Sequence, residues 1–401
     1  MLFASLKSLP SEIPSEIDAV ELRLDLNPSL KTAIPHIKKP IIIKSHDPSD
    51  VSLGEYYDCD WQDTPPEGAK IICSRHMDHT PDDLFATFTE LMKTMPAHYY
   101  KLATTAHSTL DALRMLIATR KLQAQGHPVI GLCMGELGQI TRIASSITYA
   151  HLGDPTADGQ LHARELIDIY RFPRHDKRWY GLIGDPIAQS FSHIAHNPHC
   201  FFMKMRIRPD ELDTFFQLVE QLPFHGLAVT IPHKLAVKKY CESDMPAVNT
   251  LVRDTHWKGY NTDGPGALNL LEPIENKRIA LLGAGGAAIG IAYEALKRKA
   301  VLAIYNRTPK TILGIATQSL DQLQPYDILI NATSCGMLCD DCPIRRDQLL
   351  PRTTVLETIC TPEETTLIRF AKAKNCNILH GKDMFESQAQ LQYAHWEIQA
   401  S

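Results

Sequence analysis

The segment 278–288 constrains the fold of this chain more than any other stretch of its sequence. It reads Arg-Ile-Ala-Leu-Leu-Gly-Ala-Gly-Gly-Ala-Ala, so an apolar run leads into a glycine-rich turn and then into helix-forming residues. A strand, a G-x-G-x-x-A turn and a helix are the context of a dinucleotide-binding fingerprint, in which the glycines admit a pyrophosphate to the helix N-terminus. We therefore expect a Rossmann domain. The residues expected at the cofactor are Gly283, Ala284, Gly285, Gly286 and Ala287.

The end of the next expected strand, 301–305, indicates which dinucleotide binds. NAD sites usually place an acidic residue there, where it binds the ribose hydroxyls. This chain has Asn306, Arg307 and Thr308 instead. Because a guanidinium can stack on adenine and pair with a 2′-phosphate, the sequence favours NADP(H).

Strand-like and helical patterns alternate from residue 180 onward. A strand starts at 277, other strands are expected at 180–184, 202–206, 226–230, 328–331 and 354–357, and helices at 209–222 and 362–374. This alternation is typical of a doubly wound α/β fold.

Eight short apolar runs occupy the first 150 residues. They lie at 2–6, 19–26, 40–45, 56–61, 70–74, 99–103, 129–134 and 146–150, with helical patterns at 81–94 and 108–125. Eight strands with interleaved helices predict a (β/α)₈ barrel. The segment 62–69 holds two adjacent prolines and a glycine, which leave no room for a helix. We therefore expect a barrel whose outer helices are trimmed on one side.

Two breaks divide the chain. A charged segment with one proline at 171–179 has strands on both sides, and a weaker break precedes the glycine turn. We expect three domains, a barrel at 1–175, a substrate domain at 178–272 and a Rossmann domain at 273–383. A C-terminal helix at 384–401 is expected to return to the substrate domain.

Composition excludes several classes of protein. A formal charge of −5 gives no electrostatic reason to expect nucleic acid or a membrane as a partner. The N-terminus lacks the basic region of a secretory signal, and ten cysteines without framework spacing indicate free thiols in the cytoplasm. His193, His196 and His199 would drift round a helix, so no metal site is expected. The oligomeric state stays open.

Further motifs stand in order along the second half. They are Gly-Asp-Pro-Ile-Ala-Gln-Ser-Phe-Ser-His (184–193), Ala-Val-Thr-Ile-Pro-His-Lys (228–234), Ala-Val-Asn-Thr (247–250), Gly-Tyr-Asn-Thr-Asp (259–263) and Gly-Lys-Asp-Met-Phe-Glu-Ser-Gln (381–388). Together with the glycine turn, they resemble the shikimate dehydrogenase family. The resemblance covers about 220 residues and implies reduction of a ketone with NADPH.

This resemblance assigns expected roles by position. Lys234 and Asp263 would form the catalytic pair, because an ammonium beside a carboxylate can supply a proton as hydride reaches a ketone. Ser190 and Ser192 would hold the substrate carboxylate. The residues expected to bind the ring hydroxyls are Thr230, Asn249 and Gln388, and Gly381 is expected near the cofactor.

A second set of motifs follows the expected barrel strands. It consists of Val-Glu-Leu-Arg-Leu-Asp (20–25), Ile-Cys-Ser-Arg-His (72–76), Tyr-Lys-Leu-Ala (100–103), Met-Gly-Glu-Leu-Gly-Gln-Ile-Thr-Arg (134–142) and Thr-Ala-Asp-Gly-Gln (156–160). These motifs resemble type I 3-dehydroquinate dehydratase over residues 1–172. The resemblance implies elimination of water through a lysine Schiff base.

In that family's pattern, Lys101 would form the imine and His76 would remove and return the proton. Glu21 and Arg23 would orient the histidine and the ring hydroxyls. The residues expected to clamp the substrate carboxylate and its adjacent hydroxyl are Arg142, Thr156 and Gln160. All of them fall at or just after expected strand ends, where barrel active sites lie.

The chain departs from both family patterns. Lys44 stands where the dehydratases usually have arginine, their Glu-Gly-Gly segment is missing, and Thr156 replaces a frequent serine. In the second half, His193 replaces a proline and Cys360 replaces a tyrosine. These changes leave substrate affinity, and the use of quinate as a side substrate, open.

The two resemblances together imply a bifunctional enzyme. It would dehydrate 3-dehydroquinate to 3-dehydroshikimate and reduce that product to shikimate with NADPH. Two alternatives remain, a chain in which only the dehydrogenase is active beside a structural barrel, and an NADP- or metabolite-binding regulator. Against the regulator, a relic has no reason to keep Lys101, His76, Lys234 and Asp263 together.

Overall fold

The computed structural model describes residues 1–173 and 176–398. Parts of the predicted boundary segment 171–179 and of the predicted helix 384–401 therefore lie outside the described residues. Within the described ranges, we find no helix long and apolar enough to cross a membrane.

The chain forms two compact units. One consists of Met1–Gly181 with Ser190–Phe224, and the other of Leu182–Gln189 with the chain from His225 onward.

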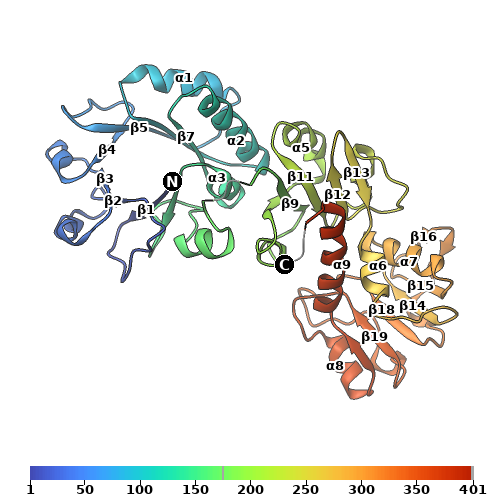
Figure 1. Cartoon of the computed structure of the whole chain (residues 1–401). Helices are drawn as coiled ribbons and strands as arrows, with labels where there is room; N and C mark the ends of the chain where they lie inside the picture. Colours follow the sequence, from blue (N-terminus) through green and yellow to red (C-terminus); the bar gives the residue numbers. More distant parts are fainter. Residues whose placement is uncertain (174–175, 399–401) are drawn as a thin grey trace. The chain divides into compact units, whose positions relative to one another are not determined.

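The first unit contains a parallel sheet of eight strands that forms a nearly closed barrel (Figure 1). Hydrogen bonds join the strands in the order β7-β6-β5-β4-β3-β2-β1-β8. The predicted eight-strand pattern is confirmed, with shifts of one to three residues at several strand ends. The strands are β1 Leu2–Leu6, β2 Ala19–Arg23, β3 Ile41–Lys44, β4 Tyr56–Asp60, β5 Lys70–Met77, β6 Tyr99–Thr105, β7 Val129–Met134 and β8 Thr148–His151.

Helices cover the outer surface of this barrel on one side only. Figure 1 shows α1 (Leu84–Thr94) and α2 (Thr109–Ala124) on the side of β5 and β7. Between β2 and β4 the connections are short 3₁₀ segments, Pro28–His36 and Pro48–Leu53. Each of these begins with a proline at its first or second position and a side-chain cap from the preceding residue. The trimming is predicted between the third and fifth strands, where the structure has only the 3₁₀ segment Pro48–Leu53 and, between β4 and β5, no helix at all in a segment that is described throughout, so the prediction is confirmed.

An apolar layer fills the part of the barrel interior that is nearer the amino ends of the strands. Its buried members include Phe3, Ala19, Ile42, Ile72 and Ile130, and Phe3 meets Tyr149 edge to face. Side chains two residues apart on a strand point to the same face. On four of these strands the next inward position toward the carboxyl end is therefore a polar residue, namely Ser5, Glu21, Lys44 or Ser74. A polar layer thus rests on an apolar one.

The remaining elements of the first unit are short. They include α3 Gln139–Ala144, a π-helical turn Glu165–Ile169, α4 Ser192–His196, β10 Phe201–Arg206 and α5 Leu212–Val219. The predicted helix 209–222 is thus found as a 3₁₀ turn followed by α5.

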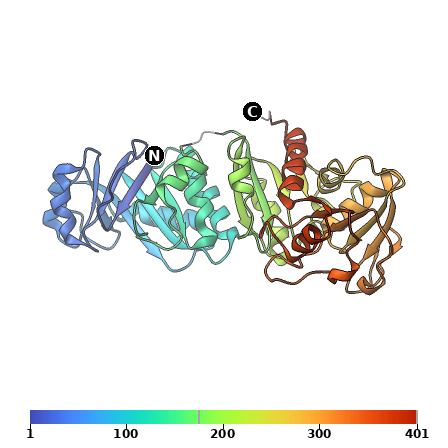
Figure 2. The same cartoon turned by 90° about the horizontal axis from the view of Figure 1, so that it is seen from below.

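A second sheet has the strand order β10-β9-β11-β12-β13. Its strands other than β10 are β9 Trp179–Gly184, β11 Phe224–Val229, β12 Thr250–Arg253 and β13 Trp257–Tyr260, and the last three pair in antiparallel fashion. The long helix α9 (Gly381–Trp396) lies beside β12 (Figure 1 and Figure 2). Its Trp396 indole donates to the carbonyl of Leu251 and covers Gly226, where a side chain would lie 2.3 Å from the indole nitrogen.

The third sheet is parallel and has the order β15-β14-β18-β19-β20. Its strands are β14 Arg278–Leu282, β15 Val301–Tyr305, β18 Ile328–Asn331, β19 Thr354–Glu357 and β20 Asn377–Leu379. The helices of this region are α6 Asp263–Leu268, α7 Gly286–Lys297 and α8 Thr366–Ala373, and a hairpin joins β16 Thr311–Ile312 to β17 Ile315–Ala316. The predicted doubly wound α/β pattern is confirmed.

Candidate active sites

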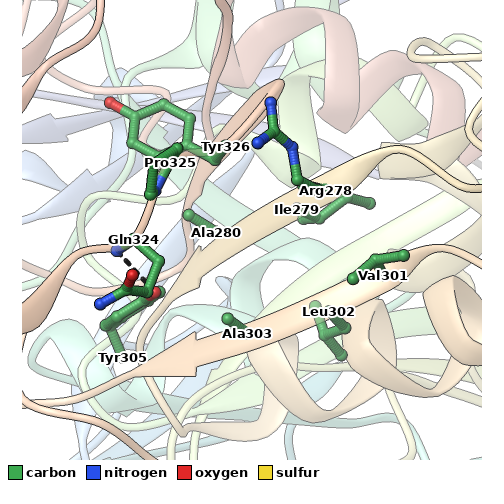
Figure 3. A pocket seen from close by; sticks show the side chains of 10 residues that line it. All are labelled: Arg278, Ile279, Ala280, Val301, Leu302, Ala303, Tyr305, Gln324, Pro325 and Tyr326. Carbon is green, nitrogen blue, oxygen red and sulfur yellow. Dashed lines mark hydrogen bonds between the residues drawn. The ribbon is translucent and has the colours of Figure 1, made fainter.

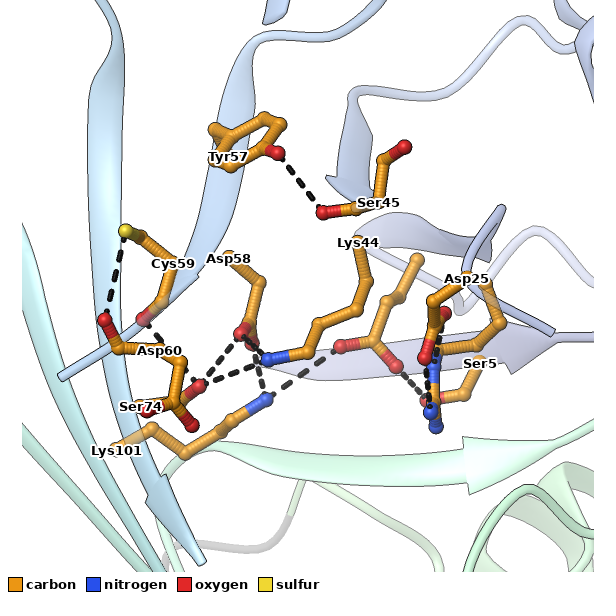
Figure 4. A network of polar contacts seen from close by, with 12 residues as sticks. Ser5, Asp25, Lys44, Ser45, Tyr57, Asp58, Cys59, Asp60, Ser74 and Lys101 are labelled. Atoms are coloured by element: carbon orange, nitrogen blue, oxygen red, sulfur yellow. Dashed lines mark hydrogen bonds and ion pairs between the residues drawn. The ribbon is translucent and has the colours of Figure 1, made fainter. Parts of the chain in front are cut away.

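The centre of the barrel holds a buried lysine among carboxylates. Lys101 on β6 forms an ion pair with Asp58 on β4 (Figure 4). Its Nζ also lies 3.5 Å from Oε1 of Glu21 on β2. The hydroxyl of Ser5 donates to Oε2 of Glu21 over 2.5 Å. The Nζ of Lys101 also lies 4.7 Å from the ring centroid of Tyr149, a cation–π distance.

Burial and charge act in opposite directions in this cluster. Burial alone would lower the pKa of Lys101, but Asp58 and Glu21 outweigh it and raise that pKa above its usual value. Burial likewise opposes ionisation of Asp58, yet the charges of Lys101 and Lys44 hold its pKa well below the usual range. The resting site therefore holds charged, mutually paired groups.

His76 stands near the carboxyl end of β5, two residues beyond Ser74, which is in register with Lys101. Its side chain keeps an exposed surface. Desolvation by the surrounding protein, followed by the charges of Lys101 and Lys44, lowers the pKa of His76 to about 4. The imidazole is therefore neutral near pH 7, the state in which it can accept a proton.

Arg142 is buried on α3 and is only partly satisfied. One of its nitrogens donates to the carbonyl of Tyr149 over 3.1 Å, whereas its Nε has no partner among the described residues. Burial lowers the pKa of Arg142 to about 10, which still leaves it charged at neutral pH. A buried, incompletely paired guanidinium is suited to an anionic ligand.

Thr156 and Gln160 are held together in the loop after β8. Oε1 of Gln160 accepts from the backbone N–H of Thr156 over 2.8 Å and from its hydroxyl over 3.1 Å. The amide nitrogen of Gln160 donates to the carbonyl of Ala150. Arg23, at the end of β2, makes a two-pronged contact with Asp25.

Lys234 and Asp263 lie together in the second unit. The Nζ of Lys234 is 2.5 Å from Oδ2 of Asp263, and both side chains are largely buried. The amide of Asn249 donates to Oδ1 of Asp263 over 3.0 Å, and Oε1 of Gln388 on α9 accepts from the hydroxyl of Thr262. Four of the predicted residues, from four separate motifs, are thus brought into one cluster.

The two predicted serines are also adjacent to each other. The hydroxyls of Ser190 and Ser192 lie 2.8 Å apart, and the Nζ of Lys204 donates to the carbonyl of Ser190. His193, the departure noted above, stacks on Tyr170 with ring centroids 6.0 Å apart. These residues belong to the first unit, whereas Thr230 belongs to the second.

The glycine turn after β14 has the geometry that a dinucleotide requires. Gly283 has a φ of +109°, which residues with a side chain rarely adopt. A Cβ on Gly285 would meet no atom within 4 Å, so the turn is open on that side. Gly285 is the N-cap of α7, which begins at Gly286, so the open space lies beside a helix N-terminus, where backbone N–H groups can bind a phosphate.

The residues after β15 complete this candidate nucleotide site. The side chain of Asn306 donates to the carbonyl of Thr308, and Arg307 is exposed. An exposed guanidinium at this place fits a 2′-phosphate. Gly381 opens α9, where any Cβ would lie 2.3 Å from the carbonyl oxygen of Ile359.

The hollow shown in Figure 3 is a different feature. It has a volume of about 180 Å³ and is lined along β14 and β15 from Arg278 to Ala280 and from Val301 to Ala303. It extends along the strands away from the glycine turn, and the hydroxyl of Tyr305 accepts from the backbone of Gln324 at its edge. We do not assign it to the nucleotide.

Asp58, Ser74 and Tyr149 are absent from the predicted barrel site, yet they contact Lys101 or its partner. The sequence carries one signal for Asp58, a carboxylate in the middle of a barrel strand, two residues after Tyr56.

Among the described residues, no three His, Cys, Asp or Glu side chains gather as a metal site.

Comparisons with known proteins agree with this division of the chain. A family model for type I 3-dehydroquinase matches residues 50–177, and one for the shikimate dehydrogenase substrate-binding domain matches residues 182–251. The bifunctional 3-dehydroquinate dehydratase/shikimate dehydrogenase of Arabidopsis thaliana is 33% identical over 83% of this chain and 63% of its own length. The shikimate biosynthesis protein AroDE of Chlamydia pneumoniae is 31% identical over 95% of this chain and 90% of its own length. The chain belongs to this bifunctional family.

A solved shikimate dehydrogenase in complex with NADP⁺ resembles the second half of this bifunctional family member. It is 31% identical, with a TM-score of 0.51, over 55% of this chain and 89% of its own chain. The chain spans 63% of the length of its plant relative, which is therefore a longer protein.

Proposed function

We propose that this chain catalyses two consecutive reactions, dehydration of 3-dehydroquinate and NADPH-dependent reduction of 3-dehydroshikimate to shikimate. The observation that carries the proposal is that one chain holds two proton-transfer centres, the buried Lys101 with Asp58 in a barrel and the Lys234–Asp263 pair beside an open glycine turn. Membership of the bifunctional family supports the same conclusion.

In the barrel, Lys101 attacks the substrate ketone as a neutral amine, the carbonyl oxygen leaves as water, and the resulting iminium ion acidifies the neighbouring C–H bond. His76 takes that proton, because its imidazole is neutral near pH 7, and returns it to the leaving hydroxyl as water departs. After the elimination, water hydrolyses the imine, which releases 3-dehydroshikimate and frees Lys101. Arg142, with its unpaired Nε, binds the substrate carboxylate. Thr156 and Gln160 bind the carboxylate and the adjacent hydroxyl.

In the second half, Lys234 donates a proton to the carbonyl oxygen of 3-dehydroshikimate, and Asp263 holds the ammonium in place at 2.5 Å. NADPH supplies the hydride when it is bound at the glycine turn. Ser190 and Ser192 bind the carboxylate. The ring hydroxyls are bound by Thr230, Asn249 and Gln388.

The domain boundaries at 175–178 and 272–273 and a cytoplasmic location are part of this proposal. All ten cysteines lie in the described residues and none of them forms a disulfide, which fits a reducing compartment. Product analysis by NMR tests the function. The purified chain should convert 3-dehydroquinate to 3-dehydroshikimate alone, and to shikimate once NADPH is added. Failure of the first step with success of the second would leave only the dehydrogenase.

A further inference from the structure

Two lysines of the barrel share one buried carboxylate (Figure 4). The Nζ of Lys44 lies 2.5 Å from Oδ1 of Asp58, while Lys101 binds Oδ2 of the same side chain. The Asp58 side chain is fully buried, with 0% exposure, and Lys44 retains 18%. The hydroxyl of Ser74 accepts from Lys44 over 3.0 Å and donates to Oδ1 of Asp58 over 2.6 Å.

This arrangement bears on a step that imine formation requires. A lysine attacks a ketone only as a neutral amine, so Lys101 must first release to the solvent the proton that pairs it with Asp58. In a site without a second cation, that release would leave Asp58 as an unpaired buried carboxylate, which is costly. With Lys44 in place, Asp58 keeps one charged partner and the donated hydrogen bond of Ser74.

We propose that Lys44 is a positioning residue for the dehydratase reaction, acting through Asp58 to hold the carboxylate paired while Lys101 is a neutral amine. The inference rests on the proposed role of Lys101 as the imine lysine. It assigns a use to the lysine that stands where the dehydratases usually have arginine. Asp58 pairs again with Lys101 once the iminium charge forms on that nitrogen.

Charge balance supports this exchange. In the resting site, the two ammonium groups of Lys44 and Lys101 face the two carboxylates of Asp58 and Glu21. Loss of the Lys101 proton leaves one negative charge in excess, whereas without Lys44 it would leave two. The other titratable groups of the neighbouring elements around Lys101 are Arg23 on β2, His76 on β5, Tyr149 on β8 and Arg142 on α3.

Reductive trapping of the full chain tests the inference. The protein is incubated with 3-dehydroshikimate and sodium cyanoborohydride over a series of pH values, and mass spectrometry measures modification of the peptides that contain Lys101 and Lys44. The variants are Lys44→Met, Lys44→Arg and Lys44→Gln, the last in case the apolar replacement does not fold. Lys31→Met is the matched control, because Lys31 forms a 2.5 Å pair with buried Asp50 elsewhere in the same barrel.

The midpoint pH for trapping at Lys101 should rise by about 1 unit in Lys44→Met and Lys44→Gln, because the neutral amine is harder to reach. Lys44→Arg should restore the original midpoint, and Lys31→Met should leave it unchanged. An unshifted midpoint in both uncharged variants would overturn the role of Lys44. Trapping on Lys44, or none on Lys101 in the natural chain at any pH, would instead overturn the proposed imine lysine and this inference with it.

Discussion

Lys234 packs so closely against Gly286 that a Cβ on the glycine would lie 2.7 Å from the Cβ of the lysine. The first residue of α7 is therefore in contact with the residue proposed to donate the proton. The glycine turn therefore adjoins the Lys234–Asp263 pair, because Lys234 contacts Gly286 and is paired with Asp263. Two glycines of the turn are expected to differ in function, Gly285 leaving space for the nucleotide and Gly283 allowing the backbone conformation of the turn, and substitutions can separate these two functions.

Gly285→Ala should weaken NADPH binding, whereas Gly283→Ala should lower the stability of the fold. A Cβ on Gly285 meets no protein atom within 4 Å, so the variant should fold normally but bind NADPH at least about tenfold more weakly, an effect of about 1.4 kcal/mol. A side chain on Gly283 is strained at φ +109° and lies 2.8 Å from the carbonyl oxygen of Ala332, which should cost about 1–3 kcal/mol of stability. Thermal unfolding without nucleotide and an NADPH titration measure the two effects. Equal losses of melting temperature would refute the distinction.

Arg307→Ala should weaken NADPH much more than NADH. A charge-assisted hydrogen bond contributes about 1.5–3 kcal/mol, so the KM for NADPH should rise roughly 10- to 100-fold while that for NADH changes little. Lys310→Ala, an exposed cation three residues along the same loop, serves as the control. If both cofactors weaken equally, Arg307 does not meet the 2′-phosphate.

His76 should remain neutral at pH values where an ordinary histidine is largely protonated. Its pKa of about 4 means that the imidazole gains a proton only in acidic solution, because desolvation by the surrounding protein and the charges of Lys101 and Lys44 oppose a further positive charge. An NMR titration of the imidazole protons tests this, with the His76→Asn variant identifying the resonance. A midpoint near 6.5 would show that the site does not depress the pKa.

Asp263→Asn should reduce the turnover of 3-dehydroshikimate by about 10²- to 10⁴-fold, the usual range for loss of a proton-transfer group. The amide can still accept from Asn249 but no longer neutralises Lys234 at 2.5 Å. The dehydratase activity of the same variant is an internal control and should be unchanged. A dehydrogenase of normal activity would remove Asp263 from the mechanism.

The sequence predicts the barrel well because its strands are short apolar runs bounded by prolines and turn residues. Leu2–Leu6 and Val129–Met134 coincide with β1 and β7. It does not predict the hairpin of β12 and β13, since Thr250–Arg253 and Trp257–Tyr260 are short and overlap motif residues.

The cluster around Lys101 is harder to predict than the strands. Asp58 lies 43 residues away in sequence and reaches Lys101 only because β4, β5 and β6 are neighbours in the barrel. The pairing of Lys44 with the same carboxylate depends on strand register, which no local pattern of residues reveals. Motif residues such as Lys234 and Asp263 are predictable because a family pattern carries them.

The most direct test of the whole account is the formation of shikimate from 3-dehydroquinate and NADPH by the Lys101→Met variant. The natural chain should consume NADPH and form shikimate from this substrate, because the barrel produces the ketone that the second half reduces. Lys101→Met should form no shikimate from 3-dehydroquinate and should regain the full rate of shikimate formation when 3-dehydroshikimate is added. Shikimate formed from 3-dehydroquinate by the variant, or none formed by the natural chain, would contradict the account.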